Sequence, residues 1–373
     1  MPQRVRRVAI LGVGLLGGSL GLRWRQQRAV AEVVGFSRSR PSAERGLALG
    51  ALDVVAPDLE SAVSGADVVV LCAPVMACLE LGPRIAALAE AGCLITDVCS
   101  TKAAMEAAMV RALAARGPRP GPLFIGGHPM AGAERGGVEA ADPYLFEQAV
   151  WVLCPPAGTP PAAVDPLAAL VEATGAHPVR LDAGVHDRRV AAVSHLPQLA
   201  AVALAETVGG GEERDPGLLA LAGGGFRDTT RIAQSPSEMW LDVLTTNTGP
   251  ILEEFDRYTA GLARLRQAVA DGDRAAIVRH FAAAAGVRAR VPARRKGLLP
   301  AYHDLVLFVP DRPGIIGRLC GALGERGINV QDIEILRLRE GEGGTLRLGF
   351  ATEAEQAAAQ DVLAGIGCPA QRR

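Results

Sequence analysis

The stretch GGHPMAGAERGG, from Gly126 to Gly137, places a histidine and a carboxylate among glycines and a proline. His128 can accept and return a proton near neutral pH, because the unperturbed pKa of histidine lies closest to neutrality. Glu134 adds a carboxylate farther along the stretch, and glycine lets the backbone approach a ligand closely. The stretch follows a predicted strand over Leu123–Ile125, so it is either a surface turn or a loop that carries a general base.

A glycine pattern near the start of the chain indicates a dinucleotide site. Gly12, Gly14 and Gly17 have the spacing G-x-G-x-x-G between a predicted strand and a predicted helix. Such glycines allow a tight turn, close approach of a pyrophosphate and helix–strand packing, and the helix N-terminus favours the phosphate charge. A purely structural turn is the alternative. The expected cofactor contacts are Gly12, Gly14, Leu15, Leu16, Gly17, Ser37, Arg38, Ala73, Pro74 and Ser100.

The end of the second predicted strand, Val33–Ser37, bears on the choice of cofactor. It lacks the acidic residue that would bind a ribose 2′-hydroxyl. Ser37 and Arg38 stand there instead and could hold a 2′-phosphate, although an arginine at this place could also be solvated. The sequence therefore leaves NAD and NADP open, and it favours NADP.

A polar segment, DVCSTK, ends another predicted strand, Cys93–Asp97. Ligands of open α/β sheets gather at the C-terminal ends of strands, so Ser100 could hydrogen-bond a substrate or a nicotinamide amide. Ser100 or Thr101 could equally cap the helix that starts at Lys102. Lys102 is one of only two lysines in a chain that otherwise uses arginine, which hints that its compact ammonium matters there.

A polar stripe is predicted farther along the chain, in a region without strand signal. On a helix His186, Val190 and Ser194 share one face, with Gln198 one turn further. A lone buried histidine is usually a satisfied core residue, but this cluster favours the wall of a pocket.

A glycine run, Gly223–Gly225, precedes a second polar cluster that contains Asp228 and Arg231. The guanidinium of Arg231 suits a substrate carboxylate, because its planar fork can donate two parallel hydrogen bonds. The alternative is an exposed Asp228–Arg231 pair, which would contribute little.

Alternating strands and helices over about the first 180 residues would position these groups. This order predicts a mostly parallel sheet with helices on both faces. The region from Ala183 to about Ala289 has the Ala, Leu and Val spacing of packed helices, broken at Gly209–Gly211 and Gly223–Gly225. The strands are expected at Arg7–Gly12, Val33–Ser37, Asp67–Ala73, Cys93–Asp97, Leu123–Ile125, Ala149–Cys154 and Pro178–Leu181.

The last part of the chain predicts a small α+β module. Arg288–Pro300 is basic and contains prolines, which is typical of a linker. The order after it is βαββα, with Cys368–Arg373 a possible last strand. Its elements are expected at Asp304–Val309, Ile315–Arg326, Asn329–Arg339, Thr345–Phe350 and a final helix. The predicted domains are 1–182 for dinucleotide binding, 183–290 for the helices, 291–301 as linker and 302–373 as the last module.

The overall composition sets the class of protein. A chain of 373 residues with 49% hydrophobic content has room for two or three domains. The net charge of −1 gives no reason to expect binding to nucleic acid or to a membrane surface. Seven cysteines without a CxxC pair indicate neither a metal site nor a complete disulfide framework, so a reducing cytoplasm is expected. The start of the chain has the basic and apolar character of a secretory signal, but its many glycines favour folded sequence.

Five segments together resemble the prephenate/arogenate dehydrogenase family of tyrosine biosynthesis: GVGLLGGSLG, DVCSTK, GGHPMAGAERGG, HDRRVAAVSHLPQ and AGGGFRDTTRIA. The resemblance covers essentially the whole chain, and the last module resembles an ACT domain, which commonly binds amino acids. It implies a Rossmann-type α/β domain, an all-α substrate and dimerisation domain, and an α+β ACT-like domain of order βαββαβ.

The resemblance also implies a reaction. The family oxidises the ring C4 hydroxyl of a cyclohexadienyl acid by hydride transfer to NAD(P) and releases the ring carboxylate as carbon dioxide. His128 would accept the hydrogen bond of that hydroxyl, and Trp240 matches a position that reaches the neighbouring subunit's site, which implies a homodimer. The implied substrate contacts are Ser100, Glu134, Ser194, His195, Gln198, Gly224, Arg231 and Trp240.

One departure from the family concerns Gln198, where the family often has a second histidine. A neutral amide carries no positive charge, so tyrosine inhibition or the preference between prephenate and arogenate could differ. In the ACT-like module, the expected contacts of tyrosine or another amino acid are Arg312, Gly314, Ile315 and Asn329. The competing hypotheses are a different oxidoreductase, such as a 3-hydroxyacid dehydrogenase, and a non-catalytic amino-acid sensor.

Overall fold

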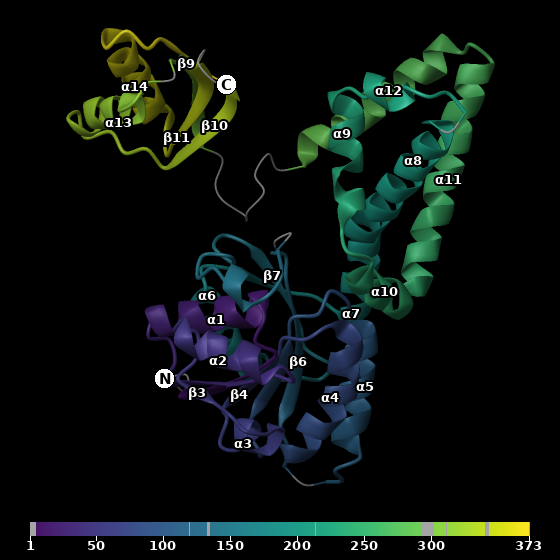
Figure 1. Cartoon of the computed structure of the whole chain (residues 1–373), viewed down its shortest axis with the longest axis vertical. Coiled ribbons are helices and arrows are strands. Elements are labelled where there is room, and N and C mark those ends of the chain that lie inside the picture. Colours follow the sequence, from purple (N-terminus) through teal and green to yellow (C-terminus); the bar gives the residue numbers. More distant parts are fainter. Residues whose placement is uncertain are drawn as a thin grey trace. The chain divides into compact units, whose positions relative to one another are not determined.

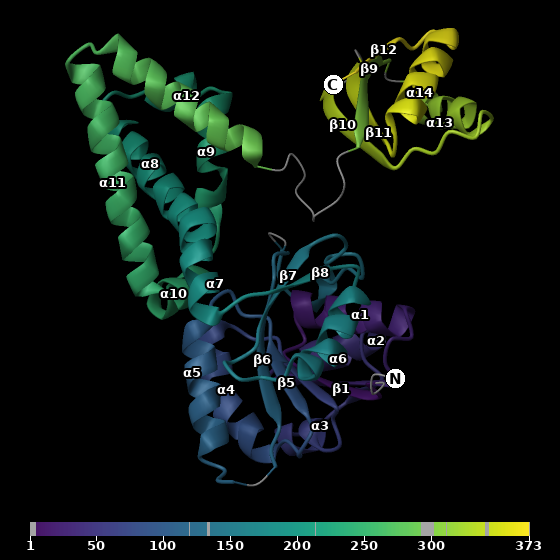
Figure 2. The same ribbon diagram turned by 180° about the vertical axis from the view of Figure 1, so that it is seen from behind.

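The computed structural model describes residues 5–118, 120–132, 135–212, 214–291, 302–310, 312–339 and 343–372. The chain forms two compact units, residues 1–298 and 299–373. The first unit contains a large sheet and a set of long helices, and the second is a small sheet with two helices (Figures 1 and 2).

The sheet of the first unit has eight strands in the order β3-β2-β1-β4-β5-β6-β7-β8. Every neighbouring pair is parallel except β6 and β7, which are antiparallel. The strand order reverses between β1 and β4, and sheets of this kind bind ligands at such a point. The strands are β1 (Arg7–Leu11), β2 (Glu32–Phe36), β3 (Val54–Val55), β4 (Val68–Leu71), β5 (Leu94–Asp97), β6 (Leu123–Pro129), β7 (Val150–Cys154) and β8 (His177–Arg180).

Helices cover both faces of this sheet, and each face has its own core. Because most strands are buried on both sides, they consist of apolar runs such as VVVL in β4 rather than alternating residues. One core involves α1 (Leu15–Gln26), α2 (Arg40–Ala48), α6 (Pro161–Glu172) and the short turn η1 (Val138–Ala140). The other involves α3 (Leu59–Val63), α4 (Val75–Leu88) and α5 (Ala103–Ala114).

A continuous helical run leads out of the sheet into the second half of this unit. A π-helical turn, η2 (Ala191–His195), joins α7 (Ala183–Val190) to α8 (Leu196–Glu212). The helices that follow are η3 (Leu218–Leu221), α9 (Gly224–Thr230), η4 (Arg231–Gln234), α10 (Ser237–Thr246), α11 (Thr248–Ala270) and α12 (Arg274–Arg290).

The predicted break at Gly209–Gly211 is wrong, because α8 continues to Glu212. A glycine costs only about 1 kcal/mol in a helix, and α8 packs on η4 and α11. The second predicted break is confirmed at Gly223, which lies between η3 and α9, whereas Gly224 and Gly225 already belong to α9.

The second unit has the order βαββαβ and an antiparallel sheet, β10-β11-β9-β12. Alternate strand residues, such as Leu305 and Leu348, form one core with Leu319 and Leu363 of its two helices. Its elements are β9 (His303–Val309), α13 (Ile315–Gly324), β10 (Asp332–Arg339), β11 (Gly343–Phe350), α14 (Glu353–Gly365) and β12 (Ala370–Arg372). Of the predicted linker, 292–301 lies outside the described residues, and Arg288–Arg290 belongs to α12.

The sequence located the strands of the first unit to within a few residues, with two exceptions. It missed β3, whose two residues are too short to give a pattern. It also ended the sixth strand at Ile125, whereas β6 runs to Pro129. His128 therefore lies on a strand, and among the described residues of the predicted loop only those after Pro129 lie outside β6.

None of the described helices combines the length and the apolar character that a bilayer-spanning segment needs. All seven cysteines are free thiols.

Candidate functional site

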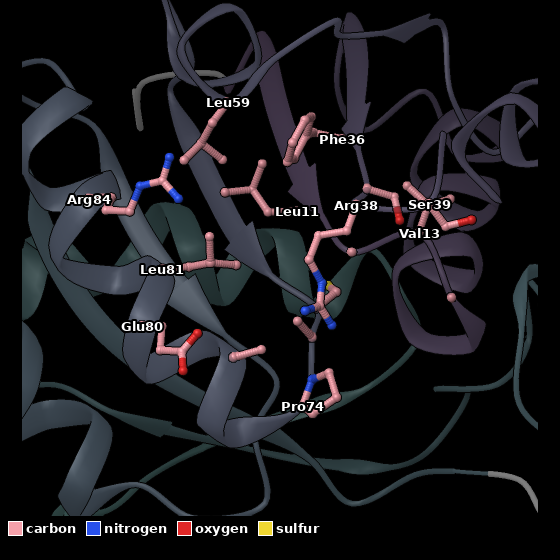
Figure 3. A pocket seen from close by; sticks show the side chains of 16 residues that line it. Leu11, Val13, Phe36, Arg38, Ser39, Leu59, Pro74, Glu80, Leu81 and Arg84 are labelled. Carbon is pink, nitrogen blue, oxygen red and sulfur yellow. The ribbon is translucent and has the colours of Figure 1, made fainter. Parts of the chain in front are cut away.

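A cavity of about 640 Å³ lies at the C-terminal ends of β1, β2 and β4, where the strand order reverses (Figure 3). Its lining is largely apolar and includes Phe36, Leu59 and Leu81. Arg38, in the turn after β2, and Arg84, on α4, bring two guanidinium groups to the same cavity. An apolar slot with cationic groups at its wall suits an adenine ring with attached phosphates.

The three glycines of the fingerprint have different tasks. Gly12 has a φ of +111°, and a Cβ on it would lie 2.3 Å from the carbonyl oxygen of Cys72. A Cβ on Gly17 would lie 2.2 Å from the carbonyl oxygen of Gly12, so α1 packs directly on the turn. Gly14 has no atom within 4 Å of its Cβ position, and it begins α1 without a side-chain cap. The N-terminus of α1 thus has no side-chain cap and leaves room beside Gly14, which fits a pyrophosphate.

The cavity lining includes most but not all of the predicted cofactor residues. Gly12, Gly14, Ser37, Arg38, Ala73 and Pro74 line it, whereas Leu15, Leu16, Gly17 and Ser100 do not. Leu15 and Leu16 offer backbone N–H groups at the start of α1. The sequence did not identify Leu59, Leu81 and Arg84, because nothing in their local pattern distinguishes them from surface or core residues.

His128 belongs to a chain of three side chains. It lies opposite Val152 where β6 pairs with β7. Its Nδ1 is 2.8 Å from Nε2 of His186 on α7, and Nδ1 of His186 is 2.7 Å from Oδ1 of Asp187. His186 and Asp187 are buried, whereas His128 is half-buried.

The hydrogen bonds fix which nitrogen of His128 can act as a base. A carboxylate only accepts, so His186 donates from Nδ1 to Asp187, and in the neutral imidazole Nε2 then carries a lone pair. His128 then donates from Nδ1 to that lone pair. Among these three side chains, Nε2 of His128 is the nitrogen that remains free to accept a proton. The positive charge of the resulting imidazolium is stabilised through His186 by Asp187.

Burial lowers the pKa of His128 well below its usual range, and the neighbouring His186, Lys102 and His195 lower it further. Burial also lowers the pKa of His195 to about 4, against the opposing effect of Asp187. Both imidazoles are therefore neutral at physiological pH, which is the state that a proton acceptor requires.

Two carboxylates of the helical region cap helices of the sheet region. Asp187 accepts hydrogen bonds from the backbone N–H groups of Lys102 and Ala103, both at 2.8 Å, at the start of α5. Asp242 of α10 accepts from the N–H of Met76, at 3.0 Å, at the start of α4. These bonds hold the two halves of the first unit together at helix N-termini, where negative charge is favoured.

The predicted capping of α5 by Ser100 or Thr101 is therefore wrong. The helix begins at Ala103, and Asp187 caps it. Thr101 is instead hydrogen-bonded to Thr246, with 2.8 Å between the hydroxyl oxygens. The hydroxyl of Ser100 makes no hydrogen bond to any described residue, so it is available to a ligand.

The π-helical turn changes which residues of the predicted polar stripe face inward. An extra residue per turn shifts the register after Val190, so Ser194 is exposed and His195 is 2% exposed. Nδ1 of His195 is 3.2 Å from Nδ2 of Asn247, which also donates to the carbonyl oxygen of Asp187 at 2.9 Å. The predicted stripe is wrong at Ser194, and the sequence missed Asn247.

The other expected substrate residues lie along the helices that follow. Gln198 is buried and donates to the carbonyl oxygen of Ile232 at 2.9 Å, which ties α8 to η4 beside Arg231. Gly224 and Arg231 are exposed. The ring of Trp240 meets His195 of its own chain edge-on, with 5.9 Å between the centroids. Glu134 lies outside the described residues.

The second unit has a cavity of about 380 Å³ between the start of α13 and the sheet. Arg312, Gly314 and Ile315 line it together with apolar residues such as Ile335. Gly314 precedes α13 with a φ of +83°, which favours glycine. Asn329 is exposed and does not line this cavity.

Within the described ranges, no group of three or more His, Cys, Asp or Glu side chains could hold a metal ion.

Three family models match the chain. They are the prephenate dehydrogenase nucleotide-binding domain over 20–180, the prephenate dehydrogenase dimerization domain over 182–283 and the ACT domain over 303–360. A prephenate dehydrogenase of Bacillus subtilis is 34% identical over 97% of either chain.

Two solved structures are similar to this chain over about three quarters of its length. One is a prephenate dehydrogenase from A. aeolicus, in complex with hydroxyphenyl propionate and NAD+, with a TM-score of 0.71 and 26% identity. It covers 78% of this chain and 100% of its own. The other is an arogenate dehydrogenase from Synechocystis, with a TM-score of 0.68 and 27% identity over 77% of this chain and 100% of its own.

Proposed function

The chain belongs to the prephenate dehydrogenase family, and from this membership we propose that it converts prephenate to 4-hydroxyphenylpyruvate and carbon dioxide while NAD(P)+ is reduced. The observation that carries the proposal is the chain of His128, His186 and Asp187. It leaves Nε2 of a neutral imidazole as a proton acceptor at the sheet edge that also holds the dinucleotide cavity.

The proposed reaction uses His128 as the group that moves a proton. When bound in the cavity lined by Gly12, Gly14 and Arg38, NAD(P)+ would supply the acceptor for the hydride of the ring carbon C4. Nε2 of His128 takes the proton of the C4 hydroxyl as that hydride leaves, so that the oxygen becomes a carbonyl. The ring carboxylate then departs as carbon dioxide, its bonding electrons complete the aromatic ring, and the phenolic oxygen regains its proton from His128. His186 and Asp187 stabilise the imidazolium between these two events.

We propose NADP as the preferred cofactor. Ser37, Arg38 and Ser39 line the cavity after β2, where an enzyme specific for NAD would usually have a carboxylate. Arg38 would pair with the 2′-phosphate. The ratio of kcat/KM for the two cofactors tests this, and a higher value with NAD+ would contradict it.

The substrate is proposed to bind between Ser100 and the helical region. Arg231 would pair with a carboxylate of the substrate, and Gln198 would hold η4 in place through Ile232. Glu134, Ser194 and Gly224 are proposed as further contacts. His195 and Trp240 would form the remaining wall.

Arogenate is the alternative substrate, and a solved relative carries that name. Gln198 is neutral, so it offers no charge to the pyruvyl carboxylate of prephenate. Rates on both substrates for the wild type and for Gln198→His would show whether this position sets the preference. An unchanged ratio would exclude Gln198 as its determinant.

A homodimer through the helical region is proposed, together with an amino-acid effector in the second unit. Val278 and Phe281 on α12 are 66% and 71% exposed, and the matched family model is described as a dimerization domain. Tyrosine or another amino acid would bind the cavity at Arg312 and Gly314. Light scattering coupled to gel filtration tests the dimer, and a monomer would contradict it.

The test of the proposed function is a steady-state assay of the purified protein. Prephenate or arogenate is mixed with NAD+ or NADP+, and the reduced cofactor is followed by its absorbance. We expect turnover with prephenate. No reduced cofactor from either substrate would contradict the proposal.

A further inference from the structure

Lys102 forms a buried ion pair for which the proposed chemistry gives no role. The side chains of Lys102 and Asp97 are both fully buried and paired with each other. Although burial works to lower the pKa of Lys102, the Asp97 carboxylate outweighs it and the pKa is raised, so the ammonium is charged. A buried ion pair costs desolvation energy and is often no more stabilising than an apolar pair. Its presence in an arginine-rich chain therefore indicates a specific task.

The ion pair holds the peptide groups of Gly127, the residue before His128. Nζ of Lys102 donates to the carbonyl oxygen of Gly127 at 2.6 Å, and Oδ1 of Asp97 accepts from the N–H of Gly127 at 3.1 Å. The ladder between β5 and β6 ends at Thr96 and Ile125. Gly127 has no partner on β5, and the side chains of Lys102 and Asp97 form hydrogen bonds with its peptide groups instead. Buried backbone groups need such partners.

The same pair is linked to the turn that carries Ser100. Oδ2 of Asp97 accepts a hydrogen bond from the N–H of Cys99 at 3.0 Å. The backbone N–H of Lys102 itself binds Asp187, the last member of the histidine chain. The residues of this one ion pair therefore contact β6, which carries His128, the turn that carries Ser100, and Asp187, which orients His186.

Close packing at this point explains the glycines before His128. A Cβ on Gly127 would lie 2.4 Å from the carbonyl oxygen of Asp97, and one on Gly126 would lie 3.2 Å from Cδ of Lys102. Larger residues would push β6 away from the ion pair.

We propose that Lys102, paired with Asp97, is a positioning residue for the reaction: it clamps the Gly127 peptide and so holds His128 in register with the Ser100 turn. Only the expected change in kcat rests on the proposed function; the position of Gly127 and the pKa of His128 do not depend on it. Lys102 has a second, electrostatic effect, because its positive charge disfavours protonation of His128.

The test compares Lys102→Met, the neutral pair Asp97→Asn/Lys102→Met, and Lys102→Arg as the conservative variant. The double variant avoids an unpaired buried carboxylate and guards against a folding defect. Arg23→Met is the matched control, because it removes a partly buried ion pair with Glu147 from the same domain. We expect kcat to fall by about 100-fold in the first two variants, the order that a displacement of about 1 Å can cause. The KM for NADP+ should stay within about twofold, and Lys102→Arg should recover part of kcat.

The pKa of His128 provides a readout that needs no substrate. The chain has only six histidines, so NMR titration of labelled imidazoles can follow His128, assigned with His128→Asn. Loss of the cation should raise the pKa of His128 and move the acid limb of the kcat/KM profile to higher pH, whereas Arg23→Met should change neither. An unchanged kcat in the folded double variant would overturn the proposal. The proposal would also fail if the pKa of His128 stayed unchanged and kcat fell only in proportion to the loss of thermal stability, as it would in Arg23→Met. If the wild type turned over neither prephenate nor arogenate, the proposed function would fail. The NMR titration of His128 would still test the role of Lys102.

Discussion

At the scale of the residue, the role of His128 is the first prediction. His128→Asn keeps a donor for His186 but has no basic nitrogen, so we expect kcat to fall by about 10²–10⁴, the range for a lost general base. KM should change much less. Steady-state kinetics check this, with Arg231→Gln as the comparison, since that variant should chiefly raise KM. The reverse pattern would mean that the two roles are exchanged.

The depressed pKa values of two histidines predict a dependence of stability on pH. The pKa of His195 is about 4 in the folded state against 6.5 in the unfolded chain, and burial also lowers that of His128. As the pH falls below 6.5, the unfolded state therefore binds protons that the folded state does not. Each such group lowers the free energy of unfolding by up to about 1.4 kcal/mol per pH unit. Above pH 7 the two groups have no effect.

Urea denaturation between pH 7.5 and 5 measures this slope. His195→Asn should have a shallower dependence than wild type, because one of the two titrating groups is absent. An identical slope in the variant would show that His195 titrates normally in the folded protein.

The sequence predicted individual groups better than their partners. His128 stood out because glycine and proline surround it, and Arg231 because it follows a glycine run. Asp187 and Asn247 did not, since each acts through contacts with residues far away in the chain. His128 meets His186 across 58 positions, and Asn247 meets Asp187 across 60. Local spacing carries no information on such pairs.

At the scale of the element, α4 depends on a cap supplied by another helix. Asp242→Ala removes the acceptor for the N–H of Met76, so we expect the free energy of unfolding to fall by about 1 kcal/mol, the usual effect of a lost N-cap. Glu253→Ala is the control, because it removes the same charge from an exposed helical position and should change stability by less than about 0.5 kcal/mol. Equal losses in the two variants would contradict the cap.

The π-helical turn shows where periodicity fails as a guide. A regular α-helix from His186 would place Ser194 on the inner face, and the sequence indicated that arrangement. Because η2 contains a wider turn, His195 takes this place and reaches Asn247. The apolar and polar pattern is the same for both geometries. The sequence pattern also failed to predict the second half of β6. Two glycines and a proline are rare in strands, but the backbone forms a strand there.

At the scale of the whole molecule, the order of parts was predictable because the hydrophobic period changes from strands to helices and back to strands. The pairing of β6 with β7 in antiparallel orientation was not, since the pattern of a buried strand does not record its direction.

The independence of the two units predicts the outcome of a truncation. The core of the second unit consists entirely of residues from Leu305 to Ala370, and those of the first unit contain none of them. A chain ending at Leu298 should therefore fold and retain a kcat close to that of the full-length protein. If tyrosine inhibits through the cavity at Arg312, the truncated chain should lose this inhibition.

A point variant separates the effect of the cavity from that of the truncation. Arg312→Ala in the full-length chain removes a charged group from the cavity lining and leaves the catalytic unit intact, so it should weaken tyrosine inhibition without altering kcat. Calorimetric titration with tyrosine should show the same loss of binding. Inhibition that survives in both proteins would place the tyrosine site in the first unit instead. Gln198 would then be the residue to change, because it is buried and its hydrogen bond to Ile232 holds η4 beside Arg231.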